Sequence, residues 1–136
     1  MKISVDWTGF EEVKAALDRW GRENIEAIER QLDDCGEDLL SKSQALAPKL
    51  TGDLEASGTK DPVQAIPSGM GVQVGFNMGY AARQHEGPGK PGPITRGKPS
   101  VDGMQPGRKY LERPLKRYQD QYKQDIADAM REVGGS

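Results

Sequence analysis

Cysteine and histidine are the scarcest side chains that could carry chemistry in this sequence. Its 136 residues include one cysteine, Cys35, and one histidine, His85. A single cysteine forms no internal disulfide, and one histidine far along the chain from it supplies no cluster of metal ligands. We therefore expect a reducing compartment, no metal site, and Cys35 as a small buried hydrophobe on a helix.

Long apolar runs are also missing. No stretch approaches the roughly 18 to 20 apolar residues of a membrane-spanning helix, and the N-terminal MKISVDWTG lacks the apolar segment of a signal peptide. Hydrophobic residues make up 35% of the chain and charged residues 29%, so one domain over 1–136 must have a modest core. We expect a soluble intracellular product that an oligomer or a partner helps to stabilise.

Charge is plentiful but unevenly distributed. The formal net charge is −2, yet residues 1–60 carry 13 acidic and 8 basic side chains, whereas residues 90–117 carry 8 basic and 2 acidic ones. Opposed charge on two regions of one chain favours head-to-tail association of identical copies. A basic segment also suits phosphate, so nucleic-acid binding is an alternative.

Apolar periodicity predicts a long first helix. A stripe of helical period runs from Phe10 to Leu39, and Pro48 should end the helix because the residue before a proline disfavours helical geometry. Glycine costs about 1 kcal/mol in a helix interior, so a bend or break near Gly36 stays open as an alternative to a continuous helix. A second stripe over 115–133, which Pro114 opens, predicts a C-terminal helix.

Alternating residues predict the strands. The clearest alternation covers 70–76, a shorter one covers 3–5, and weaker strand signals lie at 54–60 and 62–67, the last extending its neighbour or forming its own strand. The expected fold is α+β: a long N-terminal amphipathic helix, a small antiparallel sheet of three to four strands, a long Gly- and Pro-rich loop and a C-terminal helix.

The loop between the best strand and the last helix is the least regular stretch. Residues 79–115 show no hydrophobic periodicity, and long irregular loops in compact domains are usually functional or flexible until bound. We expect residues 87–109 to form a flexible arm that orders on contact with partners. In this hypothesis Arg96, Lys98, Arg108 and Lys109 contact acidic residues of a neighbour's first helix, such as Asp33, Asp34, Glu37 and Asp38.

His85 and Glu86 form the nearest approach to a catalytic pair. We expect residues 80–87 to leave the sheet as an extended segment. Adjacent side chains on a strand point to opposite faces, so the side chains of His85 and Glu86 would not converge. No nucleophile or second acid is spaced to complete a site, and the glycines of 87–92 lack the spacing of a phosphate-binding loop. We expect no enzyme activity and no cofactor, and place His85 in packing or in a hydrogen bond at a subunit contact.

Three short segments resemble one family. They are ALAPKLTGDLEASG after the first helix, VQVGFNMGYAARQHEG at the end of the best strand, and KYLERPL before the last helix. Together they are similar to the head-to-tail joining, or tail-completion, neck proteins of long-tailed bacteriophages and prophages, also described as minor capsid proteins. The matching residues are Ala47, Pro48, Thr51, Gly52, Leu54 and Ser57, then Tyr80, Ala81, Glu86 and Gly87, then Tyr110, Leu111, Arg113, Pro114 and Leu115. The chain departs from the pattern in one extra residue after Ala81, in Leu115 where a small residue is usual, and in its longer loop.

The resemblance covers roughly residues 5 to 133 and implies a structural protein of the virion neck, assembled in the host cytoplasm. It implies a homo-oligomeric ring, with a hexamer as one candidate, that meets head-completion or connector proteins and tail tube or tail terminator proteins. Genomic DNA in the lumen is a further candidate partner, and no membrane is expected. The residues expected at these contacts are Tyr80, Arg83, His85, Glu86, Lys90, Arg96, Lys98, Arg108, Lys109 and Tyr110. The alternative function is a nucleic-acid-binding module that uses the basic 90–117 segment.

Overall fold

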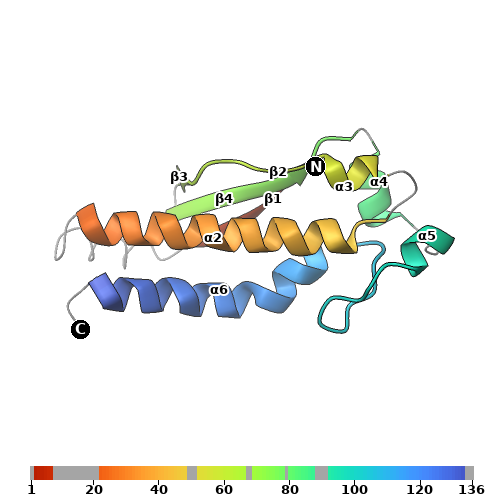
Figure 1. Ribbon diagram of the computed structural model, residues 1–136. Helices are drawn as coiled ribbons and strands as arrows, with labels where there is room; N and C mark the ends of the chain where they lie inside the picture. The colour runs from red at the N-terminus through yellow and green to blue at the C-terminus, as the bar shows by residue number, and fades with distance from the viewer. Residues whose placement is uncertain are drawn as a thin grey trace.

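The computed structural model describes residues 2–7, 22–48, 52–66, 69–78, 80–87 and 92–133. These residues form an α+β fold with a long helix, an antiparallel sheet and a long C-terminal helix, which confirms the predicted class (Figure 1). The elements in chain order are β1 (Lys2–Trp7), α2 (Arg22–Leu46), α3 (Asp53–Ala56), β2 (Gly58–Lys60), β3 (Gln64–Ile66), β4 (Gly69–Phe76), α4 (Ala81–Glu86), α5 (Pro93–Arg96) and α6 (Glu112–Val133). The predicted helical turns from Phe10 to 21, and the predicted contact residue Lys90, lie outside the described residues.

Strand β4 is the centre of the sheet, as its alternating sequence predicts. β1 pairs with one edge of β4, placing Val5 opposite Val72, while β2 and β3 both pair with the other edge. The register shifts by one residue between β2 and β3, because Thr59 is opposite Gly75 whereas Ala65 is opposite Met70. Residues 64–66 therefore continue the edge that β2 begins, after an insertion of one residue.

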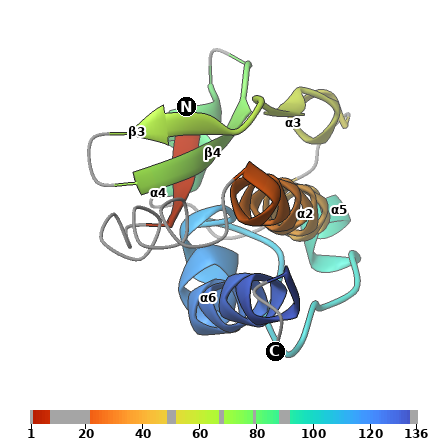
Figure 2. The ribbon, with the colours of Figure 1, turned by 90° about the vertical axis from the view of Figure 1, so that its left-hand side faces the viewer.

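Helices α2 and α6 run antiparallel and cover one face of the sheet (Figures 1 and 2). α2 contacts β1, β2 and β4, and α6 contacts α2 and β1. Alternate residues of β4 point to the helices, as the period of two in its sequence requires. The fully buried side chains between these layers are Ile28, Leu32 and Leu39 of α2, Val72, Val74 and Phe76 of β4, and Ile126 of α6.

Gly36 does not break the first helix. α2 continues from Arg22 to Leu46, which excludes a break at Gly36, and the predicted end before Pro48 is confirmed. A Cβ atom at Gly36 would lie 2.9 Å from Cδ of Lys60 and 3.0 Å from each γ-carbon of Val72. Glycine therefore lets the helix approach the sheet closely, and this packing outweighs the helix-propensity cost of about 1 kcal/mol.

Two segments expected to be extended are short helices. Residues 53–56 form α3, where the backbone N–H of Ser57 donates to the carbonyl oxygens of Asp53 and Leu54. Residues 81–86 form α4, in which Gln84 N–H donates to the Tyr80 carbonyl. In the second segment, alanine, arginine and glutamine favour a helix, and this local preference prevails over continuation of the preceding strand.

Candidate functional site

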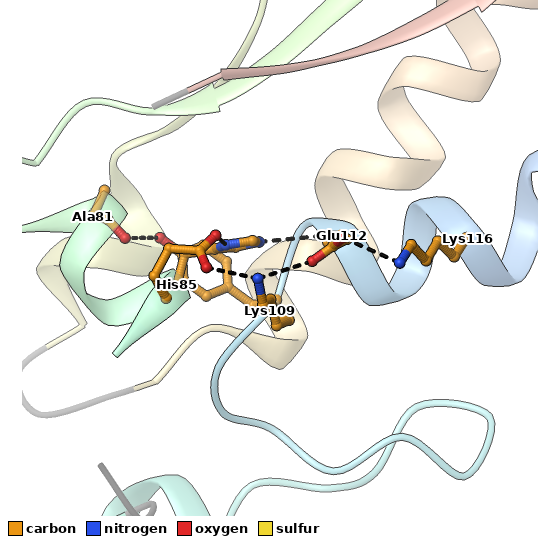
Figure 3. Close-up of polar contacts among 7 residues, drawn as sticks. Ala81, His85, Lys109, Glu112 and Lys116 are labelled. Carbon is orange, nitrogen blue, oxygen red and sulfur yellow. Dashed lines mark hydrogen bonds and ion pairs between the residues drawn. The ribbon is translucent and has the colours of Figure 1, made fainter. Parts of the chain in front are cut away.

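The three short helices α3, α4 and α5 lie at the end of the molecule where α2 ends and α6 begins (Figure 1). Within this region, α4 lies against the first turn of α6 and the residues just before it. Polar contacts join the two segments in what we call the junction cluster (Figure 3). Its members are Ala81, His85, Glu86, Lys109, Tyr110, Glu112 and Lys116.

Tyr110 anchors the junction cluster. Its side chain is completely buried, and its hydroxyl group donates a hydrogen bond of 2.7 Å to the carbonyl oxygen of Ala81. The ring meets those of Phe76 and His85 edge to face, with 5.1 Å between centroids in both pairs. Burial raises the pKa of Tyr110 far above its usual value, so the hydroxyl group stays protonated and acts as a donor.

Both ring nitrogens of His85 are used inside the chain. The backbone N–H of Glu112 donates to Nε2 at 3.2 Å, so Nε2 carries no proton, and Nδ1 must be the protonated nitrogen that donates to Glu86 Oε1 at 3.0 Å. The ring thereby caps the first turn of α6, where backbone N–H groups lack helical partners. His85 and Glu86 do converge, contrary to our expectation, because α4 is a helix and not an extended segment.

Lys109 links the two carboxylates of the junction cluster. Its Nζ lies 2.6 Å from Glu86 Oε2 and 3.2 Å from Glu112 Oε2, and Lys116 Nζ lies 3.1 Å from Glu112 Oε1. The hydrogen bond from Lys109 lowers the pKa of Glu86, while Lys116 and then Lys109 lower that of Glu112. Such exposed pairs fix geometry more than they stabilise, because water screens their attraction and ordering two long side chains costs conformational entropy.

The described part of the loop is fastened to the end of α2. Lys98 Nζ donates to the carbonyl oxygens of Gln44 at 3.1 Å and Ala47 at 2.8 Å, and Gly107 N–H donates to the Leu46 carbonyl at 2.8 Å. The last carbonyls of a helix lack helical partners and carry partial negative charge, which explains why an ammonium group binds there. Lys98 thus contacts its own first helix, whereas the sequence hypothesis placed it against a neighbour's carboxylates.

The ten predicted contact residues fall into distinct environments. His85 and Tyr110 are buried in the chain's own core, so their side chains do not face a neighbouring subunit. Lys98 and Lys109 are partly buried and bind acceptors of their own chain. The exposed members are Tyr80, Arg83, Glu86, Arg96 and Arg108.

The three segments that carry the family resemblance pack on one another here. The first pairs with the second through Gly58 opposite Phe76, and Asn77 N–H donates to the Ser57 carbonyl at 3.3 Å. The second meets the third through the Tyr110 hydroxyl group and through Lys109 N–H, which donates to the His85 carbonyl at 2.7 Å. Their shared residues therefore maintain this end of the fold.

A second site, which the sequence did not indicate, is a groove of about 350 Å³ between α2 and α6. Its lining residues are Gln31, Asp34, Cys35, Asp38, Lys42, Tyr118, Gln121, Tyr122 and Asp125. Asp38 Oδ2 accepts from the Tyr122 hydroxyl group at 2.7 Å and from Lys42 Nζ at 2.6 Å. The Asp38–Lys42 pair and the Gln121–Asp125 pair, in which Gln121 Nε2 donates to Asp125 Oδ1 at 2.8 Å, each have the four-residue spacing that is visible in the sequence. We call this feature the acidic groove.

Burial also shapes the chemistry of the acidic groove. It raises the pKa of the Cys35 thiol to about 11, with smaller contributions from nearby aspartates, so this cysteine is a buried hydrophobe, as predicted, and a poor nucleophile. Lys42 Nζ lies 4.0 Å from the centroid of the Tyr118 ring, a cation–π contact. The groove therefore presents aromatic rings and carboxylates that already hold one ammonium group.

The described residues form neither a metal site nor a membrane-spanning helix. In the described ranges, no three histidine, cysteine or carboxylate side chains are grouped so as to hold a metal ion. None of the helices in the described part of the chain is long and apolar enough to cross a membrane. No family model, curated protein or solved structure matches this chain. The family resemblance thus depends on the three short segments alone.

Proposed function

We propose that this chain is a non-enzymatic structural protein that joins phage heads to tails, assembling as a ring in the neck of the virion. One observation carries the proposal: the three segments that resemble the neck family contact one another at one end of the fold. The Tyr110–Ala81 hydrogen bond and the His85 cap on Glu112 both lie between such segments. Residues that preserve a fold in this way are expected in an assembly protein, whose motifs need not converge on a reacting atom.

The junction cluster supports the same proposal. The two nitrogens of His85 are bound to Glu86 and to the start of α6, which leaves the ring no proton acceptor for a substrate. Tyr110 is buried and its hydroxyl group is bound to a backbone carbonyl. A general base needs hydrogen-bond access to the proton it removes, so this arrangement suits scaffolding better than catalysis.

The expected partners are further copies of the chain, with a hexameric ring as one candidate, together with connector and tail proteins. Genomic DNA would pass through the lumen. The exposed residues Arg83, Arg96 and Arg108 are the basic side chains that we assign to these contacts. Lys109 is a less suitable probe than the sequence indicated, because it holds Glu86 and Glu112 of its own chain.

Nucleic-acid binding is the competing function, and the contacts of the basic segment reduce its support. Lys98 binds helix carbonyls, while Lys109 and Lys116 bind carboxylates, so three of its cations already have acceptors within the chain. If the isolated protein is primarily a DNA-binding module, the logarithm of its affinity for duplex DNA should fall linearly with the logarithm of salt concentration. A neck protein should bind such DNA weakly at physiological salt.

Disruption of the gene in the phage or prophage that encodes it tests the proposed function. Electron microscopy of the lysate should show filled heads and finished tails that are not joined. The wild-type gene supplied in trans should restore joined particles, and the Arg108→Glu variant should restore fewer while folding normally by circular dichroism. Joined, infectious particles made without the gene product would contradict the proposal.

A further inference from the structure

Residues 101–104 form a tight turn in the loop that projects between α5 and the start of α6 (Figure 1). The backbones of Val101 and Met104 exchange two hydrogen bonds of 2.9 Å. The two residues between them have positive φ angles, 48° at Asp102 and 83° at Gly103, and both are exposed. This is the pattern of a two-residue hairpin turn, in which Asp-Gly is a favoured pair. The turn therefore presents an aspartate followed by a glycine to solvent.

This Asp-Gly step brings a nucleophilic atom close to a carboxyl group. The backbone nitrogen of the residue after an aspartate can attack the side-chain carboxyl carbon and close a five-membered ring, and only glycine places no side chain beside that nitrogen. Asp102 is the one aspartate or asparagine in the sequence that glycine follows. A Cβ atom at Gly103 would meet no atom within 4 Å, and no backbone acceptor among the described residues binds its N–H. The attacking nitrogen is thus accessible.

Two contacts oppose this attack in the folded chain. The Tyr118 hydroxyl group donates to Asp102 Oδ2, so the carboxylate is turned toward α6 and must leave that contact before it meets the nitrogen of Gly103. The paired hydrogen bonds between Val101 and Met104 also hold the backbone of the turn in place. The reaction therefore requires local opening of the turn, which exposed loops undergo more readily than core elements.

We propose that Asp102 is a site of spontaneous isomerisation to isoaspartate and that the Tyr118 hydroxyl group limits the rate. The nitrogen of Gly103 loses its proton and forms a bond to Cγ of Asp102, and one carboxyl oxygen leaves as water. Water then opens the resulting succinimide ring. Cleavage between the nitrogen and the main-chain carbonyl carbon gives isoaspartate, whereas cleavage between the nitrogen and Cγ restores aspartate. One water is released and one is consumed, so the step needs no co-reactant, and it is independent of the proposed function.

Conversion would disrupt the turn that contains it. Isoaspartate carries the backbone through Cβ and Cγ, which adds one methylene group to a two-residue turn whose geometry matches its flanking strands. The free carboxylate is then attached directly to Cα and no longer reaches Tyr118. Val101 and Met104 pack against the hydrophobic core, so the converted protein should also melt at a lower temperature.

Heavy-oxygen water provides the test, because each ring that opens takes up one oxygen atom from the solvent. Purified full-length protein is incubated in this water for weeks near neutral pH, both folded and in urea, and is then digested with trypsin. Asp102 is recovered in peptide 97–108, because trypsin does not cut at a lysine that precedes a proline. Mass spectrometry detects the heavy oxygen, and chromatography separates the aspartate and isoaspartate forms. Peptides that carry Asp53 and Asp120, two other exposed aspartates, are internal controls.

We expect heavy oxygen and an isoaspartate peak at Asp102, and neither at the two control aspartates. Asp102→Glu should abolish both signals, because a glutamate would have to close a less favourable six-membered ring. Tyr118→Phe keeps the aromatic ring, and conversion of the folded protein should rise about fivefold, the population change that follows from losing one hydrogen bond. Tyr122→Phe removes a hydroxyl group that bonds Asp38 on the same helix and is the matched control. In urea, Tyr118→Phe should have no effect.

Two results would overturn the inference. Folded protein that gains no more heavy oxygen at Asp102 than at the control aspartates, while the chain in urea does, would show that the native turn is not a modification site. A Tyr118→Phe variant that converts no faster than wild type or Tyr122→Phe would show that this hydroxyl group does not limit the rate. Circular dichroism melts verify that each variant is folded, so loss of the fold cannot imitate either result.

Discussion

Tyr110 and Tyr122 are both buried tyrosines that donate hydrogen bonds at 2.7 Å, but they serve different kinds of region. Tyr110 bonds the neutral carbonyl of Ala81 within the junction cluster. Tyr122 bonds the carboxylate of Asp38, which lies 43% exposed at the rim of the acidic groove. The rings themselves are 0% and 4% exposed, so the difference lies in the acceptors and not in the tyrosines.

This comparison shows how similar residues produce either scaffold or surface. In the junction cluster, tyrosine, histidine, carboxylates and lysines bind one another and tie α4 to α6 (Figure 3). In the acidic groove, carboxylates on both helices face a hollow, and like charges there repel each other. Polar side chains at the junction thus bind one another, whereas the carboxylates of the groove lie close to groups of the same charge.

The largest expected effect is that of truncating Tyr110. Tyr110→Ala should lower the free energy of unfolding by about 3 to 5 kcal/mol, because it leaves a cavity next to Phe76 and His85 and removes the hydrogen bond to the Ala81 carbonyl. Urea titration measures the loss. Tyr118→Ala, at a half-buried ring beside the groove, is the control and should cost clearly less. Equal losses would remove the distinction between the two regions.

The reactivity of Cys35 measures whether reagents in solution can reach the base of the acidic groove. Its pKa of about 11, against an ordinary 9.0, leaves about 100-fold less thiolate near pH 8, and burial slows the reagent further. Iodoacetamide should therefore modify native Cys35 at least about 100-fold more slowly than the unfolded chain, as mass spectrometry can follow. A Cys35→Ser, Gln121→Cys variant, with an exposed thiol on the lining, should react rapidly. Equally fast reaction of Cys35 would show a groove open to its base.

Replacing His85 separates capping from packing. His85→Phe keeps a ring against Tyr110 but removes the acceptor for Glu112 N–H, so it should destabilise the protein by about 1 to 2 kcal/mol. Glu86→Gln keeps the cap and serves as the control, with a smaller loss expected in the same urea titration. If His85→Phe proves neutral, the ring contributes by shape alone.

Arg113 is the weak point of the junction end, and its removal should stabilise the chain. Its Nε and Nη2 atoms are buried without a hydrogen-bond partner, and burial lowers its pKa. Arg113→Met keeps the aliphatic stem and removes this desolvation cost, so we expect a gain of about 1 kcal/mol in the free energy of unfolding. Arg117→Met, at an exposed position one turn further on, should change little. A loss of stability on removing Arg113 would reveal an acceptor for its buried donors.

The smallest effect should come from the ion pairs of the junction cluster. The folded-state pKa values of Glu86 and Glu112 are lowered below the ordinary 4.5, so their contribution is complete above that pH and is lost as the pH falls through the lowered values. Thermal melts from about pH 6 to about pH 3 should show a decline that Lys109→Met reduces. An unchanged decline would assign the acid sensitivity to other carboxyl groups, such as those of the groove.

Local patterns predicted the elements whose signals repeat within a few residues. The alternation over Met70 to Phe76 gave β4, the stripe through Tyr118, Tyr122 and Ile126 gave α6, and Pro48 marked the end of α2. The sequence left a break at Gly36 open, because the cost of glycine is local while its benefit is a close contact with Val72 on another element. α4 was misassigned for a related reason, since its few residues follow directly on a strong strand.

The candidate sites depend on contacts between distant residues, which no local pattern contains. Tyr122 and Asp38 are 84 positions apart, and Lys98 and Ala47 are 51 apart. The sequence therefore named His85, Glu86, Lys109 and Tyr110 as notable residues without showing that they bind one another. The sequence named Asp34 and Asp38 as acidic contact residues but gave no sign of the acidic groove itself, because the groove exists only once α2 and α6 lie side by side.

The one-residue shift between β2 and β3 has a consequence for how copies can meet. An uninterrupted edge strand can form backbone hydrogen bonds with the edge strand of another molecule, and this pairing leads to open-ended aggregation. In this protein the edge formed by β2 and β3 is interrupted between Lys60 and Gln64, because one residue is inserted there and Pro62 has no backbone N–H to donate. Strand addition along this edge is thereby discouraged, so the sheet edge formed by β2 and β3 is a poor template for open-ended backbone pairing between copies.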